Sequence, residues 1–312
     1  MFMPSLSDRA PSAAGRTLRL ALLMLAGLVG GSACAQPSSA DTLTRIKERG
    51  YITLGHRESS VPFAYYAADG TVIGYSHELA LKVVDAVRRE LDEPLLVLRL
   101  VPVLPMDRIT KVRDGEVDLE CGSTTHNSLR ARQVSFSNTI FIIGTRLLTA
   151  RNSGINDFSD LGGRRVVTTA DTTSERLLRR MKEEQLLDIT ILTAPDYDSS
   201  FRVLEAGDAD AFMMDDALLY GGLAKAQEPE RWIVTGAPRS FEAYACVMKH
   251  GDLAFKRLVD RSLAEIMTSG EAEQLYRKWF MSPLPDTGLN LNFPLSDAMK
   301  ALFRAPNDKP FQ

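Results

Sequence analysis

The stretch VVTTADTTSERLLRRMKEEQLLDITIL, residues 166–192, alternates between two kinds of hydrophobic pattern. Its ends, Val166–Thr169 and Ile189–Leu192, are short runs rich in β-branched residues, which are typical of buried strands. Between them Leu178 and Met181 lie three residues apart, so they share one face of a predicted helix. A strand, a helix and a strand in this order form the repeating unit of an α/β fold.

The same alternation continues on both sides of this stretch. Short strands are predicted at Tyr51–Gly55, Val97–Val101 and Ala211–Met214. Helices are predicted at Ser76–Leu91, where apolar residues recur every four positions, and at Phe201–Ala206. The fold class predicted for the chain is therefore α/β.

The composition of the 312-residue chain narrows the possible functions. Hydrophobic residues make up 45% of the sequence, which is enough for about two domains with buried cores. The formal net charge is −3 and no basic cluster offsets it, so nucleic acid is not expected as a partner. The sequence contains no zinc-ligand spacing, nucleophile elbow or phosphate-binding loop, so we predict no catalytic residue, metal or cofactor.

The N-terminal residues have the order of a secretory signal. Arginines precede the apolar run Leu20–Val29, which is too short to cross a bilayer, and small residues follow up to the A-x-A site Ala33–Ala35. We expect residues 1–35 to be a signal peptide, and the mature chain to be a soluble monomer in the periplasm. Cys34 leaves open a second possibility, a lipid-anchored form.

Four long segments resemble a known family. They are Gly55–Phe63 (GHRESSVPF), Glu120–Thr125 (ECGSTT), Ile140–Thr149 (IFIIGTRLLT) and Ala211–Leu219 (AFMMDDALL). These segments are similar to the type II periplasmic binding proteins of solute-binding protein family 3, and more narrowly to its glutamate/aspartate-binding members. The resemblance covers residues 41–312 and implies a protein that binds L-glutamate or L-aspartate for the membrane permease of an ATP-binding-cassette (ABC) importer.

The resemblance also implies a two-lobed, Venus-flytrap arrangement with two crossings between the lobes. Lobe 1 would consist of residues 36–138 and 247–312, and lobe 2 of residues 143–240. The hinge would lie near residues 139–142 and 241–246. A ligand would bind in the cleft between the lobes, where small-molecule sites tend to occur.

The resemblance assigns one group of residues to the α-carboxylate of the ligand. Arg130 would clamp it, because a guanidinium donates two parallel hydrogen bonds. Ser123 and Thr125 would add donors from the first lobe. Thr172 and Thr173 begin a predicted helix of the second lobe, whose free N–H groups attract an anion.

A second group would bind the rest of the ligand. Asp215 matches the aspartate that takes the ammonium group, and Arg57 and Arg108 are placed near the ligand side chain. Two cations there fit a second carboxylate, since a neutral side chain would leave buried charge uncompensated. Tyr197 belongs to the same pocket, at a position where the family usually has histidine, and Pro105 replaces its usual serine.

Each assignment has a simpler alternative. Arg130 could be a surface arginine, Thr172 a helix cap, and Arg108 the ion-pair partner of Asp107 or Asp114. A dehydratase of the same fold, acting on prephenate-like substrates, would need a general acid in the cleft, and none stands out. A sensor module would be expected to continue into a transmembrane helix and a signalling domain.

Two cysteines, Cys121 and Cys246, remain after the predicted signal peptide. An even number of cysteines in an exported chain permits a disulfide, while two buried thiols are the alternative. In the two-lobed arrangement, Cys121 ends a strand beside the cleft and Cys246 lies where the chain returns to the first lobe. We therefore predict a disulfide between them.

Overall fold

The computed structural model describes residues 41–185 and 187–310, so the predicted signal peptide lies outside the described residues. The described residues form one compact unit. The strands are β1 (Tyr51–His56), β2 (Ser59–Ser60), β3 (Ala64–Tyr66), β4 (Val72–Ile73), β5 (Val97–Pro102), β6 (Leu119–Glu120), β7 (Val134–Ala150), β8 (Arg164–Thr169), β9 (Ile189–Ala194), β10 (Ala211–Asp215), β11 (Trp232–Thr235) and β12 (Phe241–Lys249). The α-helices are α1 (Thr42–Arg49), α2 (Tyr75–Leu91), α3 (Arg108–Asp114), α4 (Ser128–Ala131), α5 (Thr173–Glu184), α6 (Tyr197–Glu205), α7 (Asp216–Leu223), α8 (Leu253–Thr268), α9 (Glu271–Phe280) and α10 (Asp297–Arg304).

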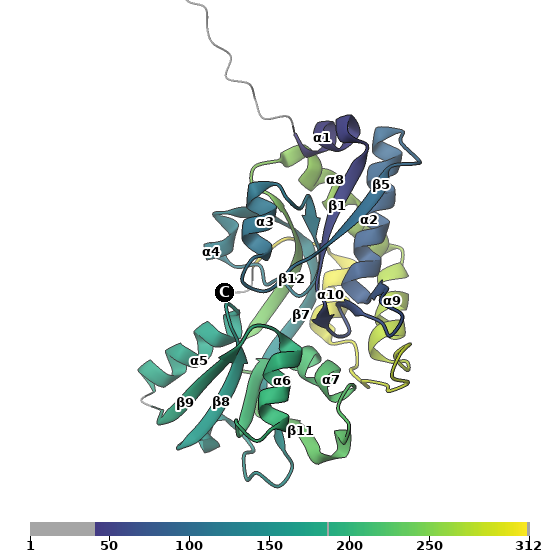
Figure 1. The fold of residues 1–312 in the computed structure, drawn as a ribbon. Coiled ribbons are helices and arrows are strands. Elements are labelled where there is room, and N and C mark those ends of the chain that lie inside the picture. Colours follow the sequence, from purple (N-terminus) through teal and green to yellow (C-terminus); the bar gives the residue numbers. More distant parts are fainter. Residues whose placement is uncertain (1–40, 186, 311–312) are drawn as a thin grey trace, which may run out of the picture. The chain divides into compact units, whose positions relative to one another are not determined.

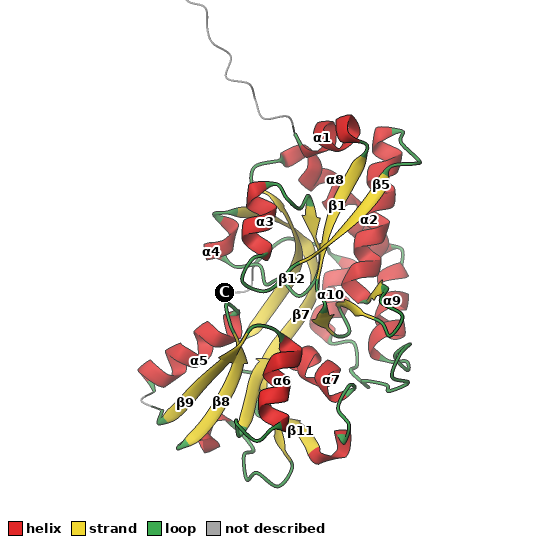
Figure 2. Cartoon of the chain, viewed as in Figure 1, coloured by secondary structure: helices red, strands yellow, loops and turns green. Residues whose placement is uncertain are grey.

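A mixed sheet runs through this unit in the order β5-β1-β6-β12-β7-β10-β8-β9, with β11 paired to β7 (Figure 1). Strand β1 is parallel to β5 and β6, and β8 is parallel to β9 and β10, as expected where helices connect the strands. Figure 2 shows helices flanking the strands at both ends of the sheet. We call β5, β1 and β6 the β5 side of the sheet, and β10, β8 and β9 the β9 side.

Strands β7 and β12 lie between the two sides, and the predicted crossings 139–142 and 241–246 fall within them. Strand β7 has 17 residues and changes partner along its length. Its first part pairs with β12 as far as Gly144, and β10 replaces β12 from Thr145 onward. A Cβ atom on Gly144 would lie 2.9 Å from Cβ of Pro238, so a larger residue would disturb the strand at this exchange.

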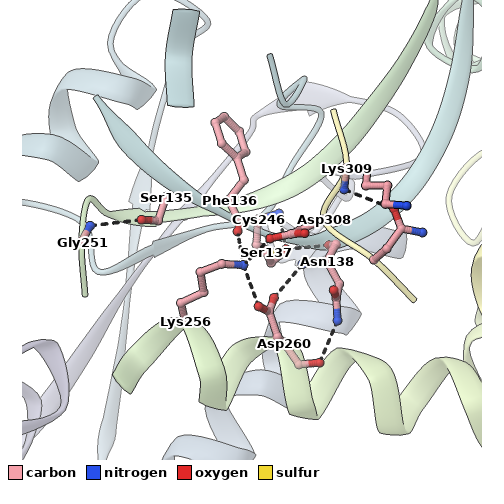
Figure 3. A network of polar contacts seen from close by, with 11 residues as sticks. Ser135, Phe136, Ser137, Asn138, Cys246, Gly251, Lys256, Asp260, Asp308 and Lys309 are labelled. Atoms are coloured by element: carbon pink, nitrogen blue, oxygen red, sulfur yellow. Dashed lines mark hydrogen bonds and ion pairs between the residues drawn. The ribbon is translucent and has the colours of Figure 1, made fainter. Parts of the chain in front are cut away.

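The first part of β7 is fastened to α8 and to the C-terminal tail by a network of polar contacts (Figure 3). Lys256 donates to the carbonyl of Phe136 at 2.8 Å and forms ion pairs with Asp260 at 2.6 Å and Asp308 at 3.0 Å. Asp260 also accepts a hydrogen bond from the backbone N–H of Asn138 at 2.7 Å. These contacts fix β7 just before the predicted crossing.

An aromatic cluster packs the middle of β7 against α9. Phe141 stacks on Tyr276 and Phe280, with ring centroids 5.7 and 4.8 Å away, and Phe63 meets Phe141 edge-on at 4.9 Å. All four side chains are buried. Such pairs add to the stabilisation from buried area, so the strand that carries the crossing is held firmly in the core.

The predicted disulfide between Cys121 and Cys246 is confirmed. The two residues lie 125 positions apart in sequence, with Cα atoms 4.3 Å apart, and both are buried. Cys121 directly follows β6 and Cys246 lies in β12, so the bond joins two neighbouring strands of the sheet.

Candidate functional site

The predicted site residues come from both sides of the sheet. Eight of the nine are buried and Thr173 is partly exposed. The β5 side contributes the loop after β1, the start of α3 and the segment from β6 to α4, while the β9 side contributes the starts of α5 and α6 and the end of β10. The nine residues are Arg57, Arg108, Ser123, Thr125, Arg130, Thr172, Thr173, Tyr197 and Asp215.

Arg130 is a buried arginine, not the surface residue of the simpler alternative. It lies in α4, a short helix that begins where the side chain of Asn127 accepts a hydrogen bond from the backbone N–H of Arg130. The Arg130 guanidinium donates to the carbonyl of Thr125 at 3.1 Å and to the carbonyl of Asp171 at 3.4 Å. Burial lowers the pKa of Arg130 to about 9, so the group remains charged at neutral pH.

The start of α5 lies beside this guanidinium. Asp171 adopts a φ of 58°, a left-handed conformation that aspartate tolerates, and its carbonyl accepts from Arg130. The hydroxyl of Thr172 accepts from the backbone N–H of Glu175 at 3.1 Å and donates to the carbonyl of Thr169 at 2.7 Å. The side chain of Thr172 therefore caps the helix, as the simpler alternative states.

Asp215 ends β10 and is buried among hydroxyl groups. Its carboxylate accepts hydrogen bonds from Thr145 at 3.1 Å, from Ser174 at 3.2 Å and from Tyr244. Burial raises the pKa of Asp215 well above its usual value, and the negative charge of Glu242 acts in the same direction. A cation next to Asp215 would reverse this shift.

Glu242 is not among the predicted residues, yet it lies at the centre of the site. It belongs to β12, is only 6% exposed, and its Oε2 atom accepts hydrogen bonds from two threonines. Thr125 donates at 2.5 Å from the β5 side, and Thr173 donates at 2.7 Å from the β9 side. One carboxylate oxygen thus connects residues from both sides of the sheet.

Arg57, Arg108, Ser123 and Tyr197 form a second group. The Arg57 guanidinium lies 5.1 Å from the centre of the Tyr197 ring, within the range of a cation–π interaction. The Tyr197 hydroxyl is 3.1 Å from the hydroxyl of Ser123, and Arg108 donates to the carbonyl of Ser123 at 2.9 Å. The arrangement connects α6 of the β9 side to the loop after β6.

Arg108 does not pair with either aspartate of its own helix. Asp107 forms an ion pair with Lys111 at 3.0 Å, and Asp114 forms one with Arg113 at 2.8 Å. The simpler alternative for Arg108 is therefore wrong.

The two arginines of this group keep donors without acceptors among the described residues. Nε and Nη1 of Arg57 and Nε of Arg108 are buried and have no hydrogen-bond partner there. Burial lowers the pKa of Arg57, and the charge of Arg108 adds to the effect. Buried donors of this kind are costly unless an acceptor reaches them.

One buried carboxylate, Glu120, lies close to these arginines. Burial raises the pKa of Glu120, while the charges of Arg108 and Arg57 oppose the shift. A Cβ atom on Gly122 would lie 2.7 Å from Oε1 of Glu120 and 2.8 Å from Cγ of Arg57, so glycine permits this close approach. A cavity of about 260 Å³ opens beside Arg57, and its other lining residues are Glu58, Ser59, Val103, Leu104, Asp196, Asp198 and Arg202.

The sequence matches one family model over residues 52–282, the bacterial extracellular solute-binding proteins, family 3. The chain belongs to this family. As a family 3 protein it has the predicted fold class, a two-lobed α/β fold of the type II periplasmic binding proteins, which is thereby confirmed.

Curated relatives of this family 3 protein are similar to it over nearly their whole length. The L-glutamate/L-aspartate-binding protein of Pseudomonas aeruginosa is 50% identical over 297 residues, which cover 94% of this chain and 98% of the relative. The glutamate/aspartate import solute-binding protein of Salmonella typhimurium is 49% identical with the same coverage. By their names these relatives are binding proteins, one of them for import, and not enzymes.

Solved structures share the fold at low sequence identity. A mutant of ArgBP from T. maritima has a TM-score of 0.68 at 23% identity and covers 77% of this chain and 99% of its own. A solute receptor for L-cysteine of Neisseria gonorrhoeae has a TM-score of 0.69 at 23% identity and covers 78% of this chain and 94% of its own. Within the described part of the family 3 protein, no helix is long and apolar enough to cross a membrane.

Proposed function

We propose that this protein captures an acidic amino acid, L-glutamate or L-aspartate, in the periplasm and delivers it, without catalysis, to the permease subunits of an ABC importer. The names of the relatives support this proposal. The observation that carries the acidic specificity is the pair of buried arginines, Arg57 and Arg108, whose buried donors have no acceptor among the described residues. A distal carboxylate would accept hydrogen bonds from those donors and add a negative charge beside the two positive ones.

The ligand would lie along a line from Arg130 to Arg57. Arg130 and the free N–H groups at the start of α5 would bind the α-carboxylate. Asp215 would take the ammonium group, which would lower the cost of burying an aspartate. Arg57 and Arg108 would bind the distal carboxylate, with Tyr197 and Ser123 setting the length of the pocket.

The two lobes, residues 36–138 with 247–312 and residues 143–240, would close on this ligand about the hinge segments. Two contacts support closure across the site: Thr125 approaches Thr173 at 3.4 Å, and Ser123 approaches Tyr197 at 3.1 Å. A ligand that touches both lobes favours the closed state by its differential affinity.

Isothermal titration calorimetry of the mature protein against the twenty common amino acids tests the proposal. We expect L-glutamate or L-aspartate to bind most tightly, and L-glutamine and L-asparagine to bind more weakly. Tighter binding of a neutral or basic amino acid would contradict the acidic specificity and leave solute binding itself intact.

A further inference from the structure

We propose that Glu242 is a positioning residue for the ammonium group of the ligand. By accepting hydrogen bonds from the hydroxyls of Thr125 and Thr173, it leaves both hydroxyl oxygens free only to accept hydrogen bonds from the ligand. This inference rests on the proposed binding of an amino acid, and it does not depend on which side chain that amino acid carries.

The geometry indicates that both threonine hydroxyls donate their hydrogen bonds to Glu242. Both hydroxyls contact the same Oε2 atom of Glu242, at 2.5 and 2.7 Å, although Thr125 and Thr173 lie 117 and 69 residues away in sequence. The two hydroxyl oxygens are themselves 3.4 Å apart. An ionised carboxylate has no proton to donate, so each threonine must donate to it.

A hydroxyl group has one proton and two lone pairs. When Thr125 and Thr173 each donate a hydrogen bond to Glu242, their oxygens can only accept further hydrogen bonds. An α-carboxylate has no N–H or O–H to offer them, whereas an α-ammonium group has three N–H donors. Both hydroxyls therefore suit the ammonium group, and the α-carboxylate is left to Arg130 and the backbone of α5.

This differs from the expectation that the resemblance gives for Thr125, which is a donor to the α-carboxylate. The carboxylate of Asp215 has the same kind of surroundings, because it accepts hydrogen bonds from the hydroxyls of Thr145, Ser174 and Tyr244. Two buried carboxylates and two acceptor hydroxyls then face the same end of the site. Such surroundings favour a group that offers several N–H donors, as an α-ammonium group does.

Two substitutions of Glu242 separate proton orientation from charge. Glu242→Gln keeps an oxygen that accepts both hydroxyl protons and removes the charge, while Glu242→Met keeps the length of the side chain and removes the acceptor. We expect L-glutamate affinity to stay within about threefold in Glu242→Gln and to fall about tenfold or more in Glu242→Met, as for lost hydrogen bonds to a charged ligand group. Equal losses in both variants, or no loss in Glu242→Met, would overturn the proposal.

A second comparison does not require the Glu242 variants to fold. Thr125→Val and Thr173→Val should each weaken L-glutamate and leave the affinity for glutarate, which has both carboxylates and no ammonium group, within about twofold, measured by competition. Equal weakening for L-glutamate and glutarate would mean that the threonines bind a carboxylate of the ligand, and this would overturn the inference. Thr149→Val is the matched control, because its buried hydroxyl donates to the carbonyl of Asp210 outside the site at 2.7 Å.

Wild-type protein titrated in parallel separates this inference from the proposed function. If the wild type prefers another amino acid, the acidic specificity fails, and the same variants are compared with that amino acid, which carries the same ammonium group. Melting curves of all variants confirm that the folded protein is being titrated.

Discussion

Arg130 and Arg57 are both buried arginines of the candidate site, yet their guanidinium groups have different surroundings. Arg130 donates to the backbone carbonyls of Thr125 and Asp171, so the protein itself holds it in place. Arg57 lies over the ring of Tyr197, and its buried Nε and Nη1 atoms have no acceptor among the described residues. The contact with Thr125 lies within one predicted lobe, so it would hold Arg130 before any ligand arrives, whereas the Arg57 end depends on the ligand for its hydrogen bonds.

This contrast separates two tasks. A group common to all amino acids can be bound by a fixed arginine, because every ligand presents it in the same way. Ligand side chains differ, and the protein can select among them with buried charges and donors that have no partner of their own. A ligand with the wrong side chain leaves these protein groups without a partner and therefore binds more weakly. The Arg130 end would thus supply general affinity, and the Arg57 end would supply the selectivity for acidic ligands.

The largest expected effect comes from the disulfide between Cys121 and Cys246, which joins β6 and β12 beside the site. Cys121 follows Glu120 near Arg57, and Cys246 lies in the same strand as Glu242 near Thr125. Replacing both cysteines with alanine should lower the free energy of unfolding by about 4–5 kcal/mol in the chain-entropy model for so long a loop. Chemical denaturation measures this loss.

The affinity of the folded double variant for L-glutamate should stay within about threefold of wild type, because neither cysteine carries a group that the ligand would use. A large loss of affinity at low denaturant would mean that the disulfide positions the site itself. Two titratable thiols in the denatured, unreduced wild type would contradict the disulfide.

Arg130→Ala should have the next largest effect. Truncating one partner of a buried charge pair costs about 2–5 kcal/mol, which is about thirty- to several-thousand-fold in affinity. The loss should be similar for L-glutamate and L-glutamine in calorimetric titrations, since both carry the α-carboxylate. Arg132→Ala is the matched control, because Arg132 is an exposed arginine at the C-cap of α4. This substitution should leave both affinities unchanged.

Tyr197→Phe should have the smallest effect. The phenylalanine ring would still lie over Arg57, but the contact between the hydroxyls of Tyr197 and Ser123 would be lost. A neutral hydrogen bond contributes about 1 kcal/mol, so L-glutamate affinity should fall about fivefold. A loss as large as that of Arg130→Ala would mean that the Tyr197 hydroxyl binds the ligand charge directly.

The sequence, with its family resemblance, predicts Arg130 and Asp215 as site residues, but it does not predict the buried Glu242 near them. The roles of Arg130 and Asp215 are predicted through the resemblance to the family, and the structure buries both residues. Glu242 could not be predicted in the same way, because its burial depends on Thr125 and Thr173, which are distant in sequence. Its only signal in the sequence is a charged residue directly before the apolar run AYACVM, residues 243–248.

Two elements of the fold were also hard to predict. Strand β7 is 17 residues long, far beyond the usual length, and its early polar residues and Gly144 hide its continuity in the sequence. Helix α6 begins at Tyr197, four residues before the predicted start at Phe201. The signal was present, because Asp196 is a favoured N-cap residue and its side chain accepts from the backbone N–H of Ser199.

The most direct test of the contrast compares L-glutamate with L-glutamine in calorimetric titrations of Arg57→Ala, Arg108→Ala and Arg130→Ala. The account predicts that Arg57→Ala and Arg108→Ala weaken L-glutamate at least about tenfold more than L-glutamine, because only L-glutamate offers a distal carboxylate. Arg130→Ala should weaken both ligands by similar factors. Parallel losses for the two ligands in all three variants would contradict the assignment of selectivity to the Arg57 end.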